Sequence, residues 1–101
     1  MTAASFSPRA RRDLWAAAEW IAKDNPAAAR ALRDAVAAAA ERIGGFPEIG
    51  VARPELAEEP RRFLALTGFA YVIVYNASRK PPLILRVLHG ARDLAEALRT
   101  L

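Results

Sequence analysis

The side chains most able to do chemistry gather at the end of one apolar run, Leu83 to His89, and in the turn that follows it. His89 is the only histidine in the chain. Its imidazole has an ordinary pKa near neutrality, which makes it the candidate acid or base. Arg86 interrupts the apolar run, and Arg92 and Asp93 follow it. A lone histidine is more often a hydrogen-bonded structural residue, so both roles stay open.

If this run is a strand, its side chains alternate between two faces. Alternation then predicts Leu83, Leu85, Val87 and His89 on one face, and Ile84, Arg86 and Leu88 on the other. One face must meet the rest of the core, and the tail or a partner chain must cover the arginine. We expect Glu55 or Asp93 to be its ion partner.

Basic side chains outnumber acidic ones, 15 to 11, and the net charge is +4. Arginine predominates, and its planar guanidinium suits contacts with carboxylate or phosphate. Several basic residues could form a rim at a sheet edge that attracts phosphate or an acidic peptide; they are Arg53, Arg61, Arg62, Arg79, Lys80 and Arg92. A solvated surface explains the same composition equally well.

Several functional classes are excluded by composition. The chain has no cysteine and one histidine, which excludes disulfide scaffolds, thiolate metal sites and multi-histidine metal sites. No glycine-rich phosphate loop is visible, so we expect neither a metal nor a cofactor. The first residues lack the apolar segment of a signal peptide, and no run has membrane-spanning length. We therefore expect a soluble cytoplasmic protein.

The elements that must position these side chains begin with a helix. A length of 101 residues predicts a single domain, 1–101. After a weakly signalled strand within residues 3–6, Ser7 and Pro8 have the types favoured at a helix cap and first turn. Trp20 borders the apolar face of this helix, which comprises Ala10, Leu14, Ala17 and Ile21. Trp15 lies off that face; it either covers a neighbouring loop, which we favour, or is an exposed contact.

A second helix follows at once. Asn25 is its expected cap, and Gly44-Gly45 should end it because glycine takes a left-handed conformation past the last turn without cost. The two helices form an antiparallel hairpin. Apolar runs at 62–66, 69–75 and 83–89 with short turns predict an antiparallel meander. Residues 93–101 predict a short amphipathic helix. The fold class is α+β, an N-terminal helical hairpin packed on a small antiparallel sheet.

In their order and spacing these residues resemble the ParE branch of the RelE/ParE toxin superfamily. The resemblance spans nearly the whole chain and rests on Phe6-Ser7-Pro8, Ala10, Asp13-Leu14, Ile21, Pro47, Gly50, Arg53, Glu55-Leu56, Arg62, Tyr71-Val72-Ile73, Tyr75 and Arg86 to Asp93. It implies the toxin of a type II toxin–antitoxin pair, neutralised by a ParD-like antitoxin. The carboxy-terminal segment of that antitoxin would wrap the hairpin and the sheet.

The resemblance also implies partner-binding residues and a target. The antitoxin-binding candidates are Trp15, Trp20, Arg53, Arg62 and Arg86. ParE toxins inhibit DNA gyrase, so the implied target is gyrase, and the target-binding candidates are Arg79, His89, Arg92 and Leu98. On this reading the protein acts by binding, not as an enzyme.

The alternative is a ribosome-dependent mRNA endonuclease of the RelE type. Its site would use Arg62, Arg86, His89 and Arg92. Such ribonucleases often carry a tyrosine near the carboxy terminus, whereas no tyrosine follows Tyr75 here and the chain has only two lysines. These differences favour gyrase over messenger RNA. A third possibility is a decayed toxin that only binds the antitoxin.

Overall fold

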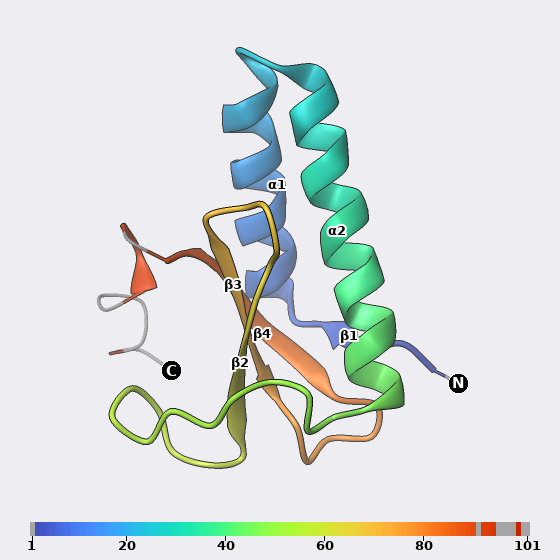
Figure 1. Cartoon of the computed structure of the whole chain (residues 1–101), viewed down its shortest axis with the longest axis vertical. Coiled ribbons are helices and arrows are strands. Elements are labelled where there is room, and N and C mark those ends of the chain that lie inside the picture. Colours follow the sequence, from blue (N-terminus) through green and yellow to red (C-terminus); the bar gives the residue numbers. More distant parts are fainter. Residues whose placement is uncertain (1, 91, 95–98, 100–101) are drawn as a thin grey trace.

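The computed structural model describes residues 2–90, 92–94 and 99 of the chain. Its elements are β1 (Ser5–Phe6), α1 (Pro8–Ala22), α2 (Pro26–Gly45), β2 (Arg61–Ala65), β3 (Tyr71–Asn76) and β4 (Leu83–His89). The strands form one sheet in the order β1-β4-β3-β2, packed against the helical hairpin (Figure 1). This architecture confirms the predicted α+β fold. The tail helix expected over 93–101, including Leu98, falls largely outside the described residues.

Both helices begin where their caps predict. The Ser7 side chain accepts a hydrogen bond from the Ala10 N–H at 3.0 Å, and the Asn25 side chain accepts one from the Ala28 N–H at 3.0 Å. Each cap satisfies a first-turn donor that has no partner within its own helix. A proline follows each cap, where its missing N–H costs nothing. The short link between Ala22 and Pro26 sets the two helices antiparallel (Figure 1).

The two glycines at the end of α2 have a different role from the one that we predicted. Gly44 and Gly45 both lie inside the helix, and Gly68, with φ 84°, is the one described residue with positive φ. A Cβ on Gly44 would collide with the Thr2 carbonyl oxygen and lie 2.8 Å from the Ala3 Cα. The expectation of a left-handed cap is therefore wrong. Gly44 permits a close crossing of α2 by the first residues of the chain.

The sheet is mixed, which corrects the expectation of an antiparallel one. Strands β2, β3 and β4 form the expected antiparallel meander. Strand β1 joins β4 in parallel, with Ser5 opposite Leu83 and Phe6 opposite Ile84. No tight turn links β1 to β4 in sequence, so turn geometry does not dictate its direction. At the other edge, Val51 and Phe63 exchange two backbone hydrogen bonds of 2.8 and 2.9 Å, which cover part of β2.

A bulge in β4 breaks the predicted alternation of its side chains. Val74 pairs with Arg86 but Tyr75 pairs with Ile84, so Leu85 is an extra residue. Ile84 and Val87 consequently both join the core cluster beneath the helices, although simple alternation places them on opposite faces. The assignment of faces along β4 was therefore wrong from the bulge onward, because an extra residue reverses the order of the faces.

The main core lies between α2 and the sheet. Its largest fully buried side chains are Leu32, Val36, Ile43, Ile73, Tyr75 and Ile84. A smaller cluster of Phe63, Val74 and Leu88 occupies the other face of the sheet, where Leu56 and Ala57 pack against it. In the part of the chain that the structure describes, no helix has the length and apolar character needed to cross a membrane.

Candidate partner-binding surfaces around helix α1

Helix α1 lies along the edge of β4 and satisfies that edge with side chains. Beyond the short strand β1, the Ser7 hydroxyl donates to the Leu85 carbonyl at 3.0 Å. Further along, the Val87 N–H donates to Asp13 Oδ2 at 3.0 Å. Polar side chains of a helix thus take the place of a neighbouring strand, and backbone groups that would otherwise lack partners are paired.

Arg86 is held by the same aspartate. Its Nε and Nη2 donate to the two carboxylate oxygens of Asp13 at 2.7 and 3.1 Å, and only 8% of the arginine is exposed. The expectation that Glu55 or Asp93 would be the ion partner is wrong. Those carboxylates pair instead with Arg53 and Arg92, each at 3.1 Å. The sequence did hold a signal: Asp13 sits in the apolar stripe of α1, between Ala10 and Ala17.

His89 closes β4 and organises the following turn. Its ring meets Tyr71 edge to face, with centroids 5.4 Å apart and planes at 82°. Its Nδ1 accepts a hydrogen bond from the Arg92 N–H at 3.1 Å, and its carbonyl accepts one from the Asp93 N–H at 2.9 Å. The side chain of Arg92 donates to the Asp93 carboxylate, which lowers the pKa of Asp93 below its ordinary value. These contacts give His89 a structural role in the free protein.

A hollow of about 320 Å³ lies beside this turn, and we call it the Trp20 hollow. It brings α1 and the end of β4 together, and its lining includes Asp13, Trp20, Tyr71, Arg86, Arg92 and Asp93. Trp20 is 64% exposed, and the Lys23 Nζ lies 5.1 Å from its ring centroid. The hollow therefore presents an aromatic surface beside two ion pairs, Arg86–Asp13 and Arg92–Asp93.

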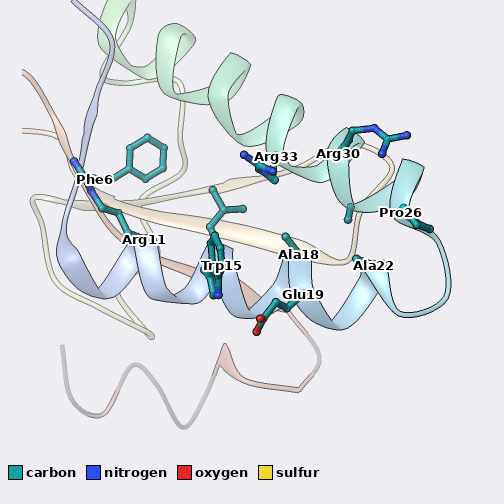
Figure 2. Close-up of a pocket in the computed structure, with 11 residues that line it drawn as sticks. Phe6, Arg11, Trp15, Ala18, Glu19, Ala22, Pro26, Arg30 and Arg33 are labelled. Carbon is teal, nitrogen blue, oxygen red and sulfur yellow. The ribbon is translucent and has the colours of Figure 1, made fainter.

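A larger groove of about 570 Å³ runs between the two helices, and we call it the hairpin groove (Figure 2). Its lining is largely apolar, with Phe6, Leu14, Trp15, Ala18, Ala22, Pro26 and Ala29. Its charged side chains are Arg11, Glu19, Arg30 and Arg33. Trp15 is 68% exposed and borders this groove opposite α2, so the favoured expectation that it covers a loop is wrong. The two tryptophans thus border different hollows on the two sides of α1.

The Pro47–Gly50 turn is held at the far end of the sheet. The Tyr75 hydroxyl donates to the Pro47 carbonyl at 2.5 Å and accepts from the Gly50 N–H at 2.9 Å. Arg62 donates to the Gly50 carbonyl at 2.9 Å. A Cβ on Gly50 would lie 2.7 Å from the Tyr75 ring and hydroxyl, so glycine is required there. Burial raises the pKa of Tyr75 above its ordinary value.

The basic candidates divide between the two ends of the sheet. His89 pairs with Tyr71 at one end of β3, and Arg62 pairs with Tyr75 near the other, about 13 Å away at the usual rise per residue. Arg79 lies in the loop between β3 and β4, so β4 separates it from Arg92. Arg86, His89 and Arg92 lie together around the Trp20 hollow. Arg92 therefore does not join the basic rim that we expected, whereas Arg61 pairs with Asn76 and lies at the same end of the sheet as the loop that carries Arg79 and Lys80.

Arg53 is exposed and lies in the segment before β2, where it pairs with Glu55. Leu98 lies outside the described residues. Among the residues that the structure describes, no group of three His, Cys, Asp or Glu side chains could hold a metal ion.

The structure is thus a helical hairpin packed on a four-stranded sheet, with one hollow on each side of α1. A family model, described as the ParE toxin of the type II toxin–antitoxin system parDE, matches residues 4–94. The chain therefore belongs to the ParE toxin family. This confirms the resemblance seen in the sequence.

A solved structure has the same fold. It is described as the chromosomal ParDE TA system from P. aeruginosa, and it superimposes with a TM-score of 0.63. The match covers 88% of this chain and 96% of the other, at 24% sequence identity. At this identity the likeness establishes the fold. Among curated proteins, none matches the chain in sequence.

Proposed function

We propose that this ParE toxin arrests growth by binding DNA gyrase in the cytoplasm, and that a ParD-like antitoxin neutralises it. The observation that carries the proposal is the family match over residues 4–94. The contacts of the candidate ribonuclease residues also favour binding over catalysis. Arg86 is engaged in a buried ion pair, and His89 Nδ1 already accepts a backbone hydrogen bond.

The antitoxin would cover the two sides of α1. Trp15 and Trp20 are 68% and 64% exposed, an unusual display of large apolar surface for one short helix. The arginines that line the hairpin groove beside Trp15 favour a segment that carries acidic as well as apolar residues. Such a segment would contact Arg86 only where that buried side chain lines the Trp20 hollow. Its continuation past the far end of the sheet would meet Arg53 and Arg62.

The target would be met at other positions. Arg79, His89, Arg92 and Leu98 remain our candidates for gyrase contact. Arg79 is an exposed cation in the β3–β4 loop, and Arg92 is exposed beside the Trp20 hollow. Arg79 and Arg92 lie at opposite ends of β4. A target that contacts both must therefore extend along the whole length of that strand.

Purified toxin tests the target directly. It should inhibit supercoiling by gyrase and increase the amount of cleaved gyrase–DNA complex, and addition of the antitoxin should reverse both effects. The antitoxin should be encoded in an adjacent reading frame. Normal supercoiling at saturating toxin, from a preparation that still arrests growth when expressed in cells, would rule out gyrase. Cleavage of mRNA on programmed ribosomes would instead support the RelE-type activity.

A further inference from the structure

Three side chains on α1 are arranged symmetrically around one point. Arg11 and Glu19 lie four residues before and four residues after Trp15, and all three line the hairpin groove. Residues four apart lie on the same side of a helix, about one turn from each other. Figure 2 shows Arg11 and Glu19 flanking Trp15 from its two sides along the helix. The row therefore reads cation, aromatic ring, anion.

We propose that two copies of this toxin associate by packing their α1 helices antiparallel across a two-fold axis at Trp15. In that arrangement the two Trp15 rings meet at the axis. Each Arg11 then faces Glu19 of the other copy, so one surface is complementary to itself. A two-fold interface requires this self-complementarity, since each residue must find its partner on an identical chain.

The charges needed for this pairing are available in the single chain. Within the described part of the chain, the ion pairs are Arg53–Glu55, Arg62–Glu59, Arg86–Asp13 and Arg92–Asp93, and they involve neither Arg11 nor Glu19. Both side chains belong to exposed residues. Arg30 and Arg33 of α2 line the same groove and have no acidic counterpart in its lining, so their positive charge opposes association and weakens it. A parallel arrangement of the helices would place like charges together, so the antiparallel one is favoured.

The tryptophan supplies most of the apolar contact. An aromatic side chain buries about 150–250 Å² when covered, and Trp15 is 68% exposed in the single chain. Two helices and their flanking alanines form a patch smaller than that of a permanent dimer. The net charge of +4 also makes the two copies repel each other at long range. We therefore expect a weak dimer that forms at micromolar concentrations.

This inference goes beyond the proposed function, because the self-association needs neither antitoxin nor gyrase. It also gives the hairpin groove a role in the free toxin. An antitoxin that covers Trp15 would compete with the second copy. Dimerisation of the toxin alone and its binding to antitoxin are separate measurements, so failure of one leaves the other intact.

Charge reversal tests the arrangement by sedimentation equilibrium of the full chain. Arg11→Glu should abolish the dimer because it places two glutamates opposite each other, and Glu19→Arg should abolish it by pairing two arginines. The double variant should dimerise as the wild type does. An equimolar mixture of the two single variants should form a heterodimer, since every cross pair is then of opposite charge.

A matched control separates this geometry from general charge attraction. Arg42→Glu and Glu41→Arg change the net charge by the same amounts at exposed positions far along α2. Each control variant should still form homodimers, and their mixture should show no preference for heterodimers. A monomeric wild type at hundreds of micromolar would overturn the proposal. Unchanged dimerisation of Arg11→Glu and Glu19→Arg would overturn it equally.

Discussion

At the scale of single residues, the Asp13 carboxylate makes more hydrogen bonds than any other side chain in the described part of the chain. Its two oxygens accept three hydrogen bonds, two from the Arg86 guanidinium and one from the Val87 N–H. It therefore neutralises a buried cation and also pairs a backbone group at the sheet edge. The ion pair links α1 to β4 across 73 residues of sequence.

Removing this carboxylate should be costly. Asp13→Ala leaves the Arg86 charge buried without a partner, and we expect the free energy of unfolding to fall by about 3–5 kcal/mol. The double variant with Arg86→Leu should recover most of that loss. A remainder of about 1–3 kcal/mol should persist because the Val87 N–H still lacks an acceptor. Urea denaturation measures both values.

Asp34→Ala is the matched control, since that aspartate is exposed on α2. It should change stability by no more than about 0.5 kcal/mol. If Asp13→Ala were equally mild, the ion pair would contribute nothing to holding α1 on the sheet.

Tyr75 gives the second prediction at this scale. Tyr75→Phe removes the acceptor of the Gly50 N–H and should destabilise the protein by about 1–3 kcal/mol. Burial raises the pKa of the Tyr75 phenol above its ordinary value of 10.0. Its contribution to stability is therefore complete below pH 10 and is lost as the pH rises through the folded-state pKa.

Thermal unfolding at several pH values checks this sign. Between pH 9 and pH 11 the wild type should lose more stability than Tyr75→Phe. Equal losses in the two proteins would show that Tyr75 does not ionise on unfolding in this range. Leu64→Ala at a neighbouring β2 position would serve as a control, because it removes apolar contacts without a titrating group.

At the scale of elements, the crossing of α2 by the first residues depends on Gly44. Gly44→Ala must displace residues 2 and 3 and so weaken β1, at a cost of about 1–3 kcal/mol. Gly90 is the matched control, because its nearest neighbour to an added Cβ, a Val72 methyl, lies 3.5 Å away. Gly90→Ala should be tolerated. Chemical denaturation of both variants tests the difference, and equal stabilities would contradict it.

The elements themselves were largely predictable from local patterns. Ser7 and Asn25 cap helices because their side chains satisfy free N–H groups a few residues away, which is local chemistry. The bulge at Leu85 and the parallel pairing of β1 depend on strands distant in sequence, so no local pattern shows them. The role of Gly44 likewise depends on an approach by Thr2 and Ala3. Long-range geometry accounts for each of these misses.

At the scale of the whole molecule, the two tryptophans should dominate antitoxin binding. Trp15→Ala and Trp20→Ala should each weaken the complex with a ParD-like antitoxin at least tenfold, since buried aromatic anchors typically contribute about 2 kcal/mol or more. Folding should be unaffected because both rings are mostly exposed. Isothermal titration calorimetry measures the affinity.

Phe46→Ala is the matched control for this prediction. Phe46 is also 64% exposed, but it lies at the carboxy-terminal end of α2. Antitoxin affinity should be unchanged in this variant. A loss equal to that of the tryptophan variants would mean that the antitoxin covers a different face.

The candidate surfaces were less predictable than the fold. The residue types at Trp15, Trp20 and Arg92 suggested contacts, but which of them share a hollow follows from how α1 lies along β4. Arg62 and His89 could be grouped into one site only while the pairing of β2 and β4 with β3 was unknown. Family resemblance indicated the kind of partner, since matching motifs extend along the chain, but it could not place each contact.

The edges of the sheet limit how any partner can engage it. Asp13 and Ser7 occupy the backbone groups of β4 beyond β1, and Val51 occupies those at the middle of β2. An added strand, whether from an antitoxin or from a misfolded neighbour, finds little continuous backbone to pair with. A partner must therefore grip side chains or first displace Asp13 or Val51. The same arrangement protects the toxin from edge-to-edge aggregation while it is alone.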